Sequence, residues 1–216
     1  MRSYDEYCAV ARSLDVVGDR WTLLIVRELA IKGASRYTDL RAGLPGIATN
    51  LLADRLRELE RAGVIERLQA PPPIATTLFS LTPRGERLRG VLEELGRWGA
   101  PLMLEPKPGD AVRSHWLAWA LGLLLSDHRS DEPPITIELR TGNEPIVIEA
   151  GADFRVRAGP VENPDAVLIG EPNPVLGLVL GLLDITSAAA RGVTYEGSPE
   201  LLDRIRPTPA ELAALI

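Results

Sequence analysis

A short run of residues that cannot continue a helix divides this chain into two parts. The run covers residues 105–110, where Pro106 and Pro108 lack backbone donors and restrict the residues before them. The pattern before the run is mostly helical, whereas short β-type runs alternate with helices after it. At 216 residues the chain is long enough for two cores. We therefore expect an N-terminal domain over residues 1–104, a linker over residues 105–110 and a C-terminal domain over residues 111–216.

Charge is unevenly distributed between these parts. Residues 1–104 hold 15 Lys and Arg against 13 Asp and Glu, a net charge of +2. Residues 105–216 hold 9 against 17, a net charge of −8, and the two sum to the −6 of the whole chain. Because acidic groups repel phosphates, we expect any contact with nucleic acid to come from the N-terminal half.

Neither the start of the chain nor its apolar runs indicate export or a membrane. Residues 1–7 include Arg2, Asp5 and Glu6 and contain no apolar run. The longest apolar stretch, residues 116–125, is about half of what a membrane span needs. We expect a cytoplasmic, nucleoid-associated protein with no membrane contact. A single cysteine, Cys8, excludes an internal disulfide and a zinc site built from several cysteines.

Helices and one hairpin account for the N-terminal half. In chain order the expected elements are a helix over residues 7–17, a second helix that Asp19 caps and Gly33 stops, helices over residues 37–42 and 49–62, strands over residues 65–68 and 77–81, and a helix that begins at Thr82 and Pro83. A short helix, a glycine-containing turn, a longer helix and a hairpin are the order that a winged helix-turn-helix requires. We therefore predict this fold.

The expected helix over residues 49–62 has an apolar and a polar side. Leu52, Leu56 and Leu59 share the side that must face a core. The polar side includes Thr49, Asn50, Ala53, Asp54, Arg57 and Arg61. Amide, hydroxyl and guanidinium groups at a helix start can read base edges in a major groove. A solvated face is the alternative, but the order of elements favours DNA binding.

Further DNA contacts are expected from the neighbouring elements. Arg67 and Gln69 leave the first strand of the hairpin on the side of the minor groove, but the apolar loop over residues 70–75 carries no arginine. That loop is expected to pack against sugars or against the protein itself. Phosphate contacts are expected from Arg36, Thr38, Arg41 and Arg84, each of which could equally be an ordinary surface residue.

Several sequence blocks in this half resemble the HxlR-type winged-helix regulators, relatives of the MarR group. The blocks are residues 7–11, 14–25, 27–29, 44–47, 56–60 with Gly63, and 80–85. The resemblance implies a homodimer paired through the first and last helices of the domain, on a near-palindromic double-stranded operator. Two-fold symmetry then places the two recognition helices roughly 34 Å apart. Ala48 replaces the small hydroxyl residue common in the family, so we expect Thr49 to cap the helix, and residues 71–74 are less polar than the usual wing.

Cys8 has two interpretations. Some members of the family use a cysteine near this position to sense oxidants or electrophiles. A helix start favours the thiolate, but Asp5 and Glu6 oppose it. A disulfide could form only with another subunit or a small thiol. We favour the other interpretation, a small apolar residue on the inner side of the first helix.

The C-terminal half is predicted to be α+β, with strands segregated from helices. Expected strands cover residues 135–139, 146–148, 154–157, 166–169 and 193–196, and expected helices cover residues 112–125, 174–183 and 185–190, with further helices at the end of the chain. Residues 166–171 leading into 174–176, and residues 190–193 with Glu196 and Gly197, resemble the sterol-carrier-protein type-2-like fold.

That resemblance implies a sheet under helices that enclose an apolar tunnel for a lipid-like or polycyclic ligand. Its expected lining residues are Trp116, Trp119, Leu123, Phe154, Leu176, Val179 and Leu180. The alternative is that all seven are ordinary core residues.

An enzymatic function is not indicated. His115 and His128 are the only histidines and have no metal-ligand spacing, and consecutive Ser126, Asp127 and His128 cannot form a triad. We expect no metal, no cofactor and no catalytic site. The sequence favours a dimeric DNA-binding regulator, most simply a repressor, whose C-terminal domain senses a hydrophobic small molecule. The alternatives are a C-terminal domain that only dimerises or docks a partner, and a carrier of lipid-like ligands that does not bind DNA.

Overall fold

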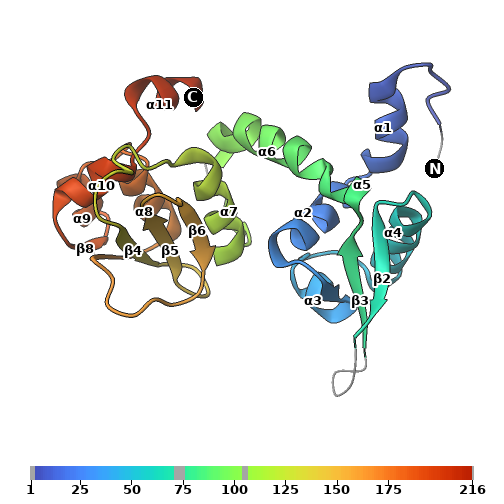
Figure 1. Ribbon diagram of the computed structural model, residues 1–216, viewed down its shortest axis with the longest axis horizontal. Helices are drawn as coiled ribbons and strands as arrows, with labels where there is room; N and C mark the ends of the chain where they lie inside the picture. The colour runs from blue at the N-terminus through green and yellow to red at the C-terminus, as the bar shows by residue number, and fades with distance from the viewer. Residues whose placement is uncertain (1–2, 71–75, 104–106, 216) are drawn as a thin grey trace. The chain divides into compact units, whose positions relative to one another are not determined.

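The structure, a computed structural model, describes residues 3–70, 76–103 and 107–215 (Figure 1). It consists of two compact units, Met1–Glu94 and Leu95–Ile216. The division lies inside helix α6 (Leu88–Gly99), earlier than the expected linker, of which Glu105 and Pro106 lie outside the described residues. Gly96 explains this position, because a Cβ there would lie 3.0 Å from side-chain atoms of Trp119 and Leu123. The last turns of α6 therefore pack within the C-terminal unit.

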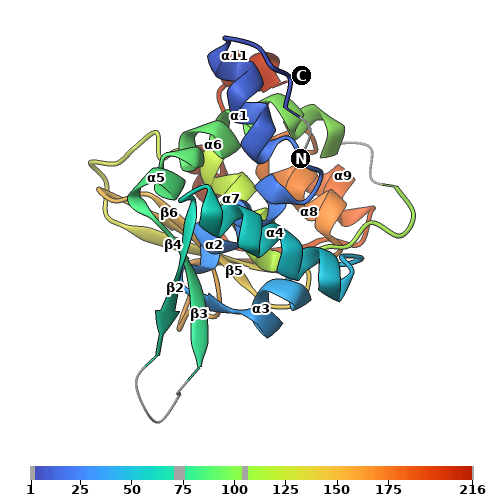
Figure 2. The same ribbon diagram turned by 90° about the vertical axis from the view of Figure 1, so that its right-hand side faces the viewer.

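The N-terminal unit has the predicted winged helix-turn-helix order. Its elements are α1 (Ala9–Val17), α2 (Thr22–Lys32), β1 (Ser35–Arg36), α3 (Tyr37–Ala42), α4 (Thr49–Arg61), β2 (Ile65–Gln69), β3 (Thr77–Leu81), α5 (Pro83–Glu86) and the start of α6. The strands form an antiparallel sheet in the order β1-β3-β2. Figures 1 and 2 show the β2–β3 hairpin extending away from the helices of this unit.

Leucines and a capped turn hold this unit together. Leu52, Leu56 and Leu59 of α4 are buried, as the sequence predicts. Thr82 accepts a hydrogen bond from the Gly85 N–H at 3.1 Å and donates to the Gly63 carbonyl at 2.7 Å. One hydroxyl therefore caps α5 and ties it to the end of α4.

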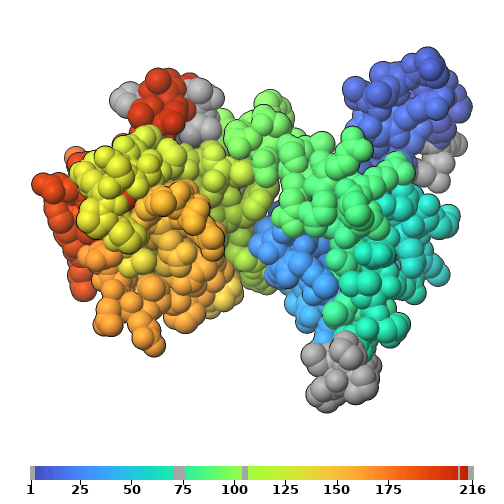
Figure 3. Space-filling model, viewed as in Figure 1, coloured from blue at the N-terminus to red at the C-terminus, as the bar shows by residue number. Residues whose placement is uncertain are grey.

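Helix α1 differs from its prediction. It begins at Ala9 rather than at residue 7, and Tyr7, Val10 and Leu14, which recur at helical spacing, are exposed. The reason is visible in Figure 3, where the N-terminal segment stands off from the rest of its unit. A helix with few neighbours in its own unit cannot bury a full stripe.

The C-terminal unit is a mixed sheet with helices, as the α+β prediction states. Its remaining elements are η1 (Ala100–Met103), α7 (Ser114–Leu124), β4 (Ile135–Arg140), β5 (Ile146–Ala150), β6 (Arg155–Ala158), β7 (Ala166–Ile169), α8 (Pro172–Val179), α9 (Ile185–Ala189), β8 (Thr194–Glu196), α10 (Pro199–Ile205) and α11 (Pro209–Leu215). The strand order is β6-β5-β4-β7-β8, in which β4 and β7 are parallel and the other neighbours antiparallel.

Strand alternation explains where the core of this unit lies. Ile137 and Leu139 of β4 pack in one cluster with apolar residues of α7, α8 and α10. Glu138 points to the other face and pairs with Arg140 at 2.8 Å. None of the helices within the described ranges is long and apolar enough to cross a bilayer.

A buried ion pair lies at the edge of this core. Arg204 of α10 donates to both carboxylate oxygens of Asp127 at 2.8 Å, and both side chains are almost fully buried. Arg204 also donates to the Pro133 carbonyl at 2.7 Å. The bonds from Arg204 lower the pKa of Asp127 and fasten α10 to the segment that follows α7.

Candidate nucleic-acid interface

A glycine in the turn and one hydrogen bond fix the helix α4 relative to α3. The turn contains Gly46 at φ 86°, a left-handed conformation that glycine adopts without strain. The Tyr37 hydroxyl, at the start of α3, donates to the Thr49 carbonyl at 2.6 Å. This bond connects the first residues of the two helices, so the start of α4 is held in a defined place.

The expected cap of α4 is absent. Ala48 occupies the N-cap position with extended backbone and offers no side-chain acceptor, and Thr49 is the first helical residue. The prediction that Thr49 caps the helix is therefore wrong. The conformation at Ala48 already satisfies the cap geometry, so the side chain of Thr49 is left exposed.

The predicted DNA-contacting side chains are accessible. All of them are exposed except the half-buried Ala53; they are Arg36, Thr38, Arg41, Thr49, Asn50, Asp54, Arg57, Arg67, Gln69 and Arg84. Arg36 precedes α3 and lies opposite Leu78 of β3, so the start of α3 adjoins the hairpin. The helices α3 and α4 and the hairpin are therefore neighbours within the N-terminal unit.

Two of these arginines already have acidic partners. Arg57 forms a close ion pair with Asp54 on α4. Arg67 of β2 pairs with Glu60 of α4 at 3.0 Å. The spacing of residues 54 and 57 on a helix could have indicated the first pair. Nothing in the sequence indicated the second, because it requires the hairpin to pack beside α4.

Gln69 is also engaged, at the base of the wing. Its amide donates to the Thr77 hydroxyl at 3.1 Å, across the register pair of β2 and β3. Residues 71–75 of the expected wing loop lie outside the described residues. The side chain of Gln69 therefore contributes to closing the hairpin.

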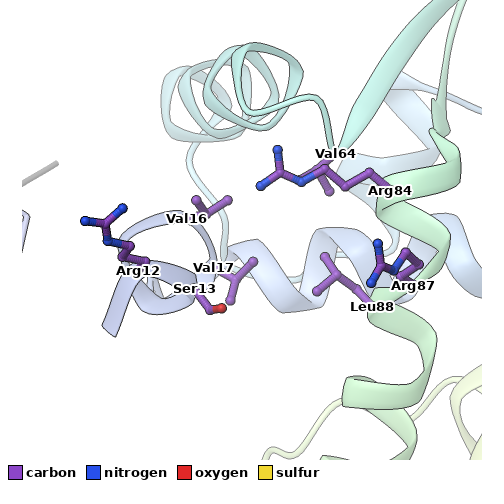
Figure 4. A pocket seen from close by; sticks show the side chains of 8 residues that line it. All are labelled: Arg12, Ser13, Val16, Val17, Val64, Arg84, Arg87 and Leu88. Carbon is purple, nitrogen blue, oxygen red and sulfur yellow. The ribbon is translucent and has the colours of Figure 1, made fainter. Parts of the chain in front are cut away.

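Arg84 lines a groove that sequence reasoning missed. The groove measures about 350 Å³ and lies between α1 and the α5–α6 region (Figure 4). Valine and leucine side chains from both sides line it together with Arg12, Arg84 and Arg87. Within the described residues no carboxylate lies within ion-pair distance of Arg84 or Arg87. This groove is open and carries uncompensated positive charge.

Cys8 is not the inner apolar residue that we favoured. It is exposed at the N-cap of α1. The nearby backbone N–H groups of Ala11 and Val10 lower the pKa of the Cys8 thiol. The correction follows from the position of α1, which leaves its first turn in solvent.

Within the described residues, the space found where the apolar tunnel is expected is small. A pocket of about 50 Å³ lies among η1, α7 and α8, whereas ligand sites usually measure roughly 300–1,000 Å³. Of the seven expected residues, Leu176 and Leu180 line it. The five that do not are Trp116, Trp119, Leu123, Phe154 and Val179.

The reason lies in the orientation of α7 and α8. Helix α7 directs Leu117 and Leu121 toward this pocket, while Trp119 and Leu123 lie against Gly96 instead. Val179 is fully buried in the core of the unit. The described residues also contain no group of three or more His, Cys, Asp or Glu that could hold a metal ion.

Comparisons with known proteins bear on the N-terminal half. The sequence model of the HxlR-like helix-turn-helix family matches residues 16–106. The uncharacterized HTH-type transcriptional regulator YvaP of Bacillus subtilis (strain 168) is 34% identical over 87 residues, which is 40% of this chain and 80% of that protein. The HTH-type transcriptional regulator YodB of the same organism is 31% identical over 100 residues, 46% of this chain and 86% of that protein.

Solved structures match the same region. The reduced form of YodB from B. subtilis covers 49% of this chain and 100% of its own, with 29% identity and a TM-score of 0.40. Family assignment rests on the sequence matches, and it concerns the half that carries α3, α4 and the wing. Through this half the chain belongs to the HxlR-like helix-turn-helix family.

Proposed function

We propose that this chain is a DNA-binding transcriptional repressor that binds a near-palindromic operator as a homodimer. The observation that carries the proposal is the exposed polar face of α4, with Asn50, Asp54 and Arg57, opposite a side fixed by three buried leucines. A rigid helix with amide and guanidinium groups on its free side suits a major groove. The relatives YvaP and YodB, which match this half of the chain, are named as HTH-type transcriptional regulators.

Exposed apolar residues on α1 and α6 support the homodimer. On α6, Val91, Leu95 and Trp98 are 49%, 46% and 74% exposed and recur at helical spacing. At and before α1, Tyr7, Val10 and Leu14 are exposed as well. Contiguous apolar side chains on a surface mark a protein interface. A second copy of the chain would cover both helices and the groove between α1 and α5–α6.

The oligomeric state can be tested by one pair of variants. Trp98→Ala should shift the full-length protein toward monomer in light scattering at a fixed low concentration. Ile169→Ala, which removes an exposed apolar side chain from β7, should leave the mass unchanged. A wild-type protein that is monomeric at micromolar concentration would contradict the homodimer.

DNA binding is tested with the full-length protein and duplex DNA from upstream of its own coding region. The affinity should exceed that for random duplex by about 10³–10⁷-fold and should fall linearly with salt on logarithmic axes. Arg41→Ala should reduce the salt slope by about 0.9, whereas Arg191→Ala, an exposed arginine of the C-terminal unit, should not. Absence of binding to any duplex would favour the carrier of lipid-like ligands that does not bind DNA.

We also propose that the C-terminal unit senses a hydrophobic small molecule between α7 and α8, in a sterol-carrier-like arrangement. The supporting observation is the pocket lined by Leu176 and Leu180, next to the part-exposed side chains of Met103 and Leu182. Because the pocket holds only about 50 Å³, a ligand would have to displace these partly exposed side chains. Ligand binding alters DNA affinity only if it favours one arrangement of the two recognition helices.

Oleate and pyrene serve as probes for this second function. Saturable quenching or enhancement of tryptophan fluorescence should be lost in Leu176→Trp, which fills the pocket, and kept in Ile169→Trp on the opposite face of the sheet. Absence of saturable binding by wild-type protein would leave the unit as a module for dimerisation or partner docking.

A further inference from the structure

The exposed face of α4 carries a carboxylate where a DNA-binding surface would ordinarily avoid one. Asp54 lies three residues before Arg57, and the two side chains form a close ion pair. They are 51% and 61% exposed, so neither contributes to the core. Within the described residues, each is the other's only ion-pair partner.

Another arginine of α4, Arg55, forms ion pairs that do support the fold. Arg55 reaches Asp19, before α2, at 3.2 Å and also contacts Glu58. Its side chain is only 18% exposed, and the pair joins two segments of the fold. The Asp54–Arg57 pair joins nothing beyond α4, so the packing of the unit does not account for it.

The chemistry of the two groups points to a particular base pair. A carboxylate near DNA is repelled by phosphates, and pairing with it cancels the general attraction of Arg57. A donor on a base edge compensates, and the N4 amine of cytosine is such a donor on a base whose own major-groove edge carries no acceptor. Adenine also offers an amine, but its N7 acceptor lies beside it. Arginine in turn matches O6 and N7 of guanine.

We propose that Asp54 and Arg57 form one specificity element that restricts each operator half-site to a G·C pair at one position. Arg57 donates to O6 and N7 of the guanine, and Asp54 accepts from the N4 amine of the paired cytosine. In the major groove these groups lie side by side, as the carboxylate and guanidinium do on α4. The inference rests on the proposed DNA-binding function and adds the base pair that the helix reads.

Selection from a pool of randomised duplexes tests it, with full-length protein at fixed salt. Wild type should enrich half-sites with an invariant G·C pair. Asp54→Asn should admit adenine at the cytosine position, and Asp54→Ala should weaken the preference for the G·C pair to that supplied by Arg57 alone, each with discrimination there reduced roughly 5- to 150-fold per half-site. Both variants should bind random duplex more tightly. Glu162→Gln, an exposed position in the C-terminal unit with the same charge change, should retain the wild-type preference.

The outcomes separate this inference from the function beneath it. Asp54 variants that keep the wild-type preference at every position would overturn the inference, even if Arg57→Ala alters it. A relaxed preference in Glu162→Gln equal to that in Asp54→Asn would also overturn it, because net charge would then be the cause. A wild-type protein that enriches no motif would instead refute the proposed function, and the inference with it.

Discussion

One helix of each unit shows a different distribution of apolar residues around its axis. In the N-terminal unit α4 is amphipathic, with buried leucines on one side and a free polar face on the other. In the C-terminal unit α7 is apolar on nearly every side and carries neither Asp, Glu, Lys nor Arg. A free polar face can be interpreted directly as a binding surface. An apolar helix cannot, because the same residue types build a core and line a ligand site.

The largest expected effect is a loss of stability in the C-terminal unit alone. Arg204→Ala leaves the buried Asp127 carboxylate unpaired and should destabilise the C-terminal unit by about 3–5 kcal/mol. Calorimetry should show one transition lowered and the other unchanged. Operator binding at temperatures below both transitions should be retained. Loss of both transitions together would show that the units fold as one.

The same ion pair predicts a dependence on pH. Since the pKa of Asp127 is lowered in the folded protein, the unfolded chain takes up this proton first as the pH falls. The stabilisation is therefore complete above the ordinary aspartate pKa of about 3.9 and is lost as the pH falls through the lower folded value. Urea denaturation at pH 6 and pH 3 measures the free energy of unfolding. The decrease due to this ion pair should appear in wild type and not in Arg204→Ala. Equal losses in both proteins would contradict it.

Leu56→Ala provides the matching change in the other unit. Leu56 is 1% exposed at the centre of α4, so its truncation should lower the free energy of unfolding by about 2–5 kcal/mol. In thermal unfolding of this variant, the transition temperature of the N-terminal unit should fall and that of the C-terminal unit should not change. This is the reverse of the effect of Arg204→Ala. The control is Leu68→Ala on the wing strand β2, which should have a small effect because that side chain is 40% exposed. Equal destabilisation by the two leucine variants would show that burial in α4 is not the cause.

Arg57→Ala should weaken operator binding by about 1–3 kcal/mol without changing either thermal transition. Arg57 is exposed, and its removal affects the surface that is proposed to meet a base. Fluorescence anisotropy at fixed salt measures the change, with Arg191→Ala as the control. An unchanged affinity would remove Arg57 from the interface.

The smallest expected effect concerns Cys8. Backbone N–H groups lower the pKa of the Cys8 thiol. The pH midpoint of its alkylation by iodoacetamide should therefore lie below that of an unstructured cysteine peptide measured beside it. Cys8→Ser should abolish labelling, since the chain has one cysteine. An apparent pKa equal to that of the peptide would show that α1 does not affect the thiol. A change in operator affinity after labelling would support a redox role.

Much of the fold follows from local signals. The glycine-containing turn before α4, the helix start at Thr82 and Pro83 and the strand over residues 135–139 were predicted, because each depends on residues close together in the chain. The candidate DNA-binding residues of α4 were named for the same reason and stay a prediction. The ends of helices were less accurate, since α1 begins two residues later than expected, at Ala9 rather than Tyr7.

By itself the sequence determined the order of elements, the helix that could read DNA and the membership of a regulator family. Tertiary structure decided which apolar residues became core and which stayed in solvent. Leu14 and Cys8 are exposed, Val179 is buried, and Trp119 packs against Gly96 instead of lining a cavity. The physical reason is that hydrophobicity states only that a side chain favours burial. The neighbour that buries it is supplied by elements distant in the chain, or by a second molecule.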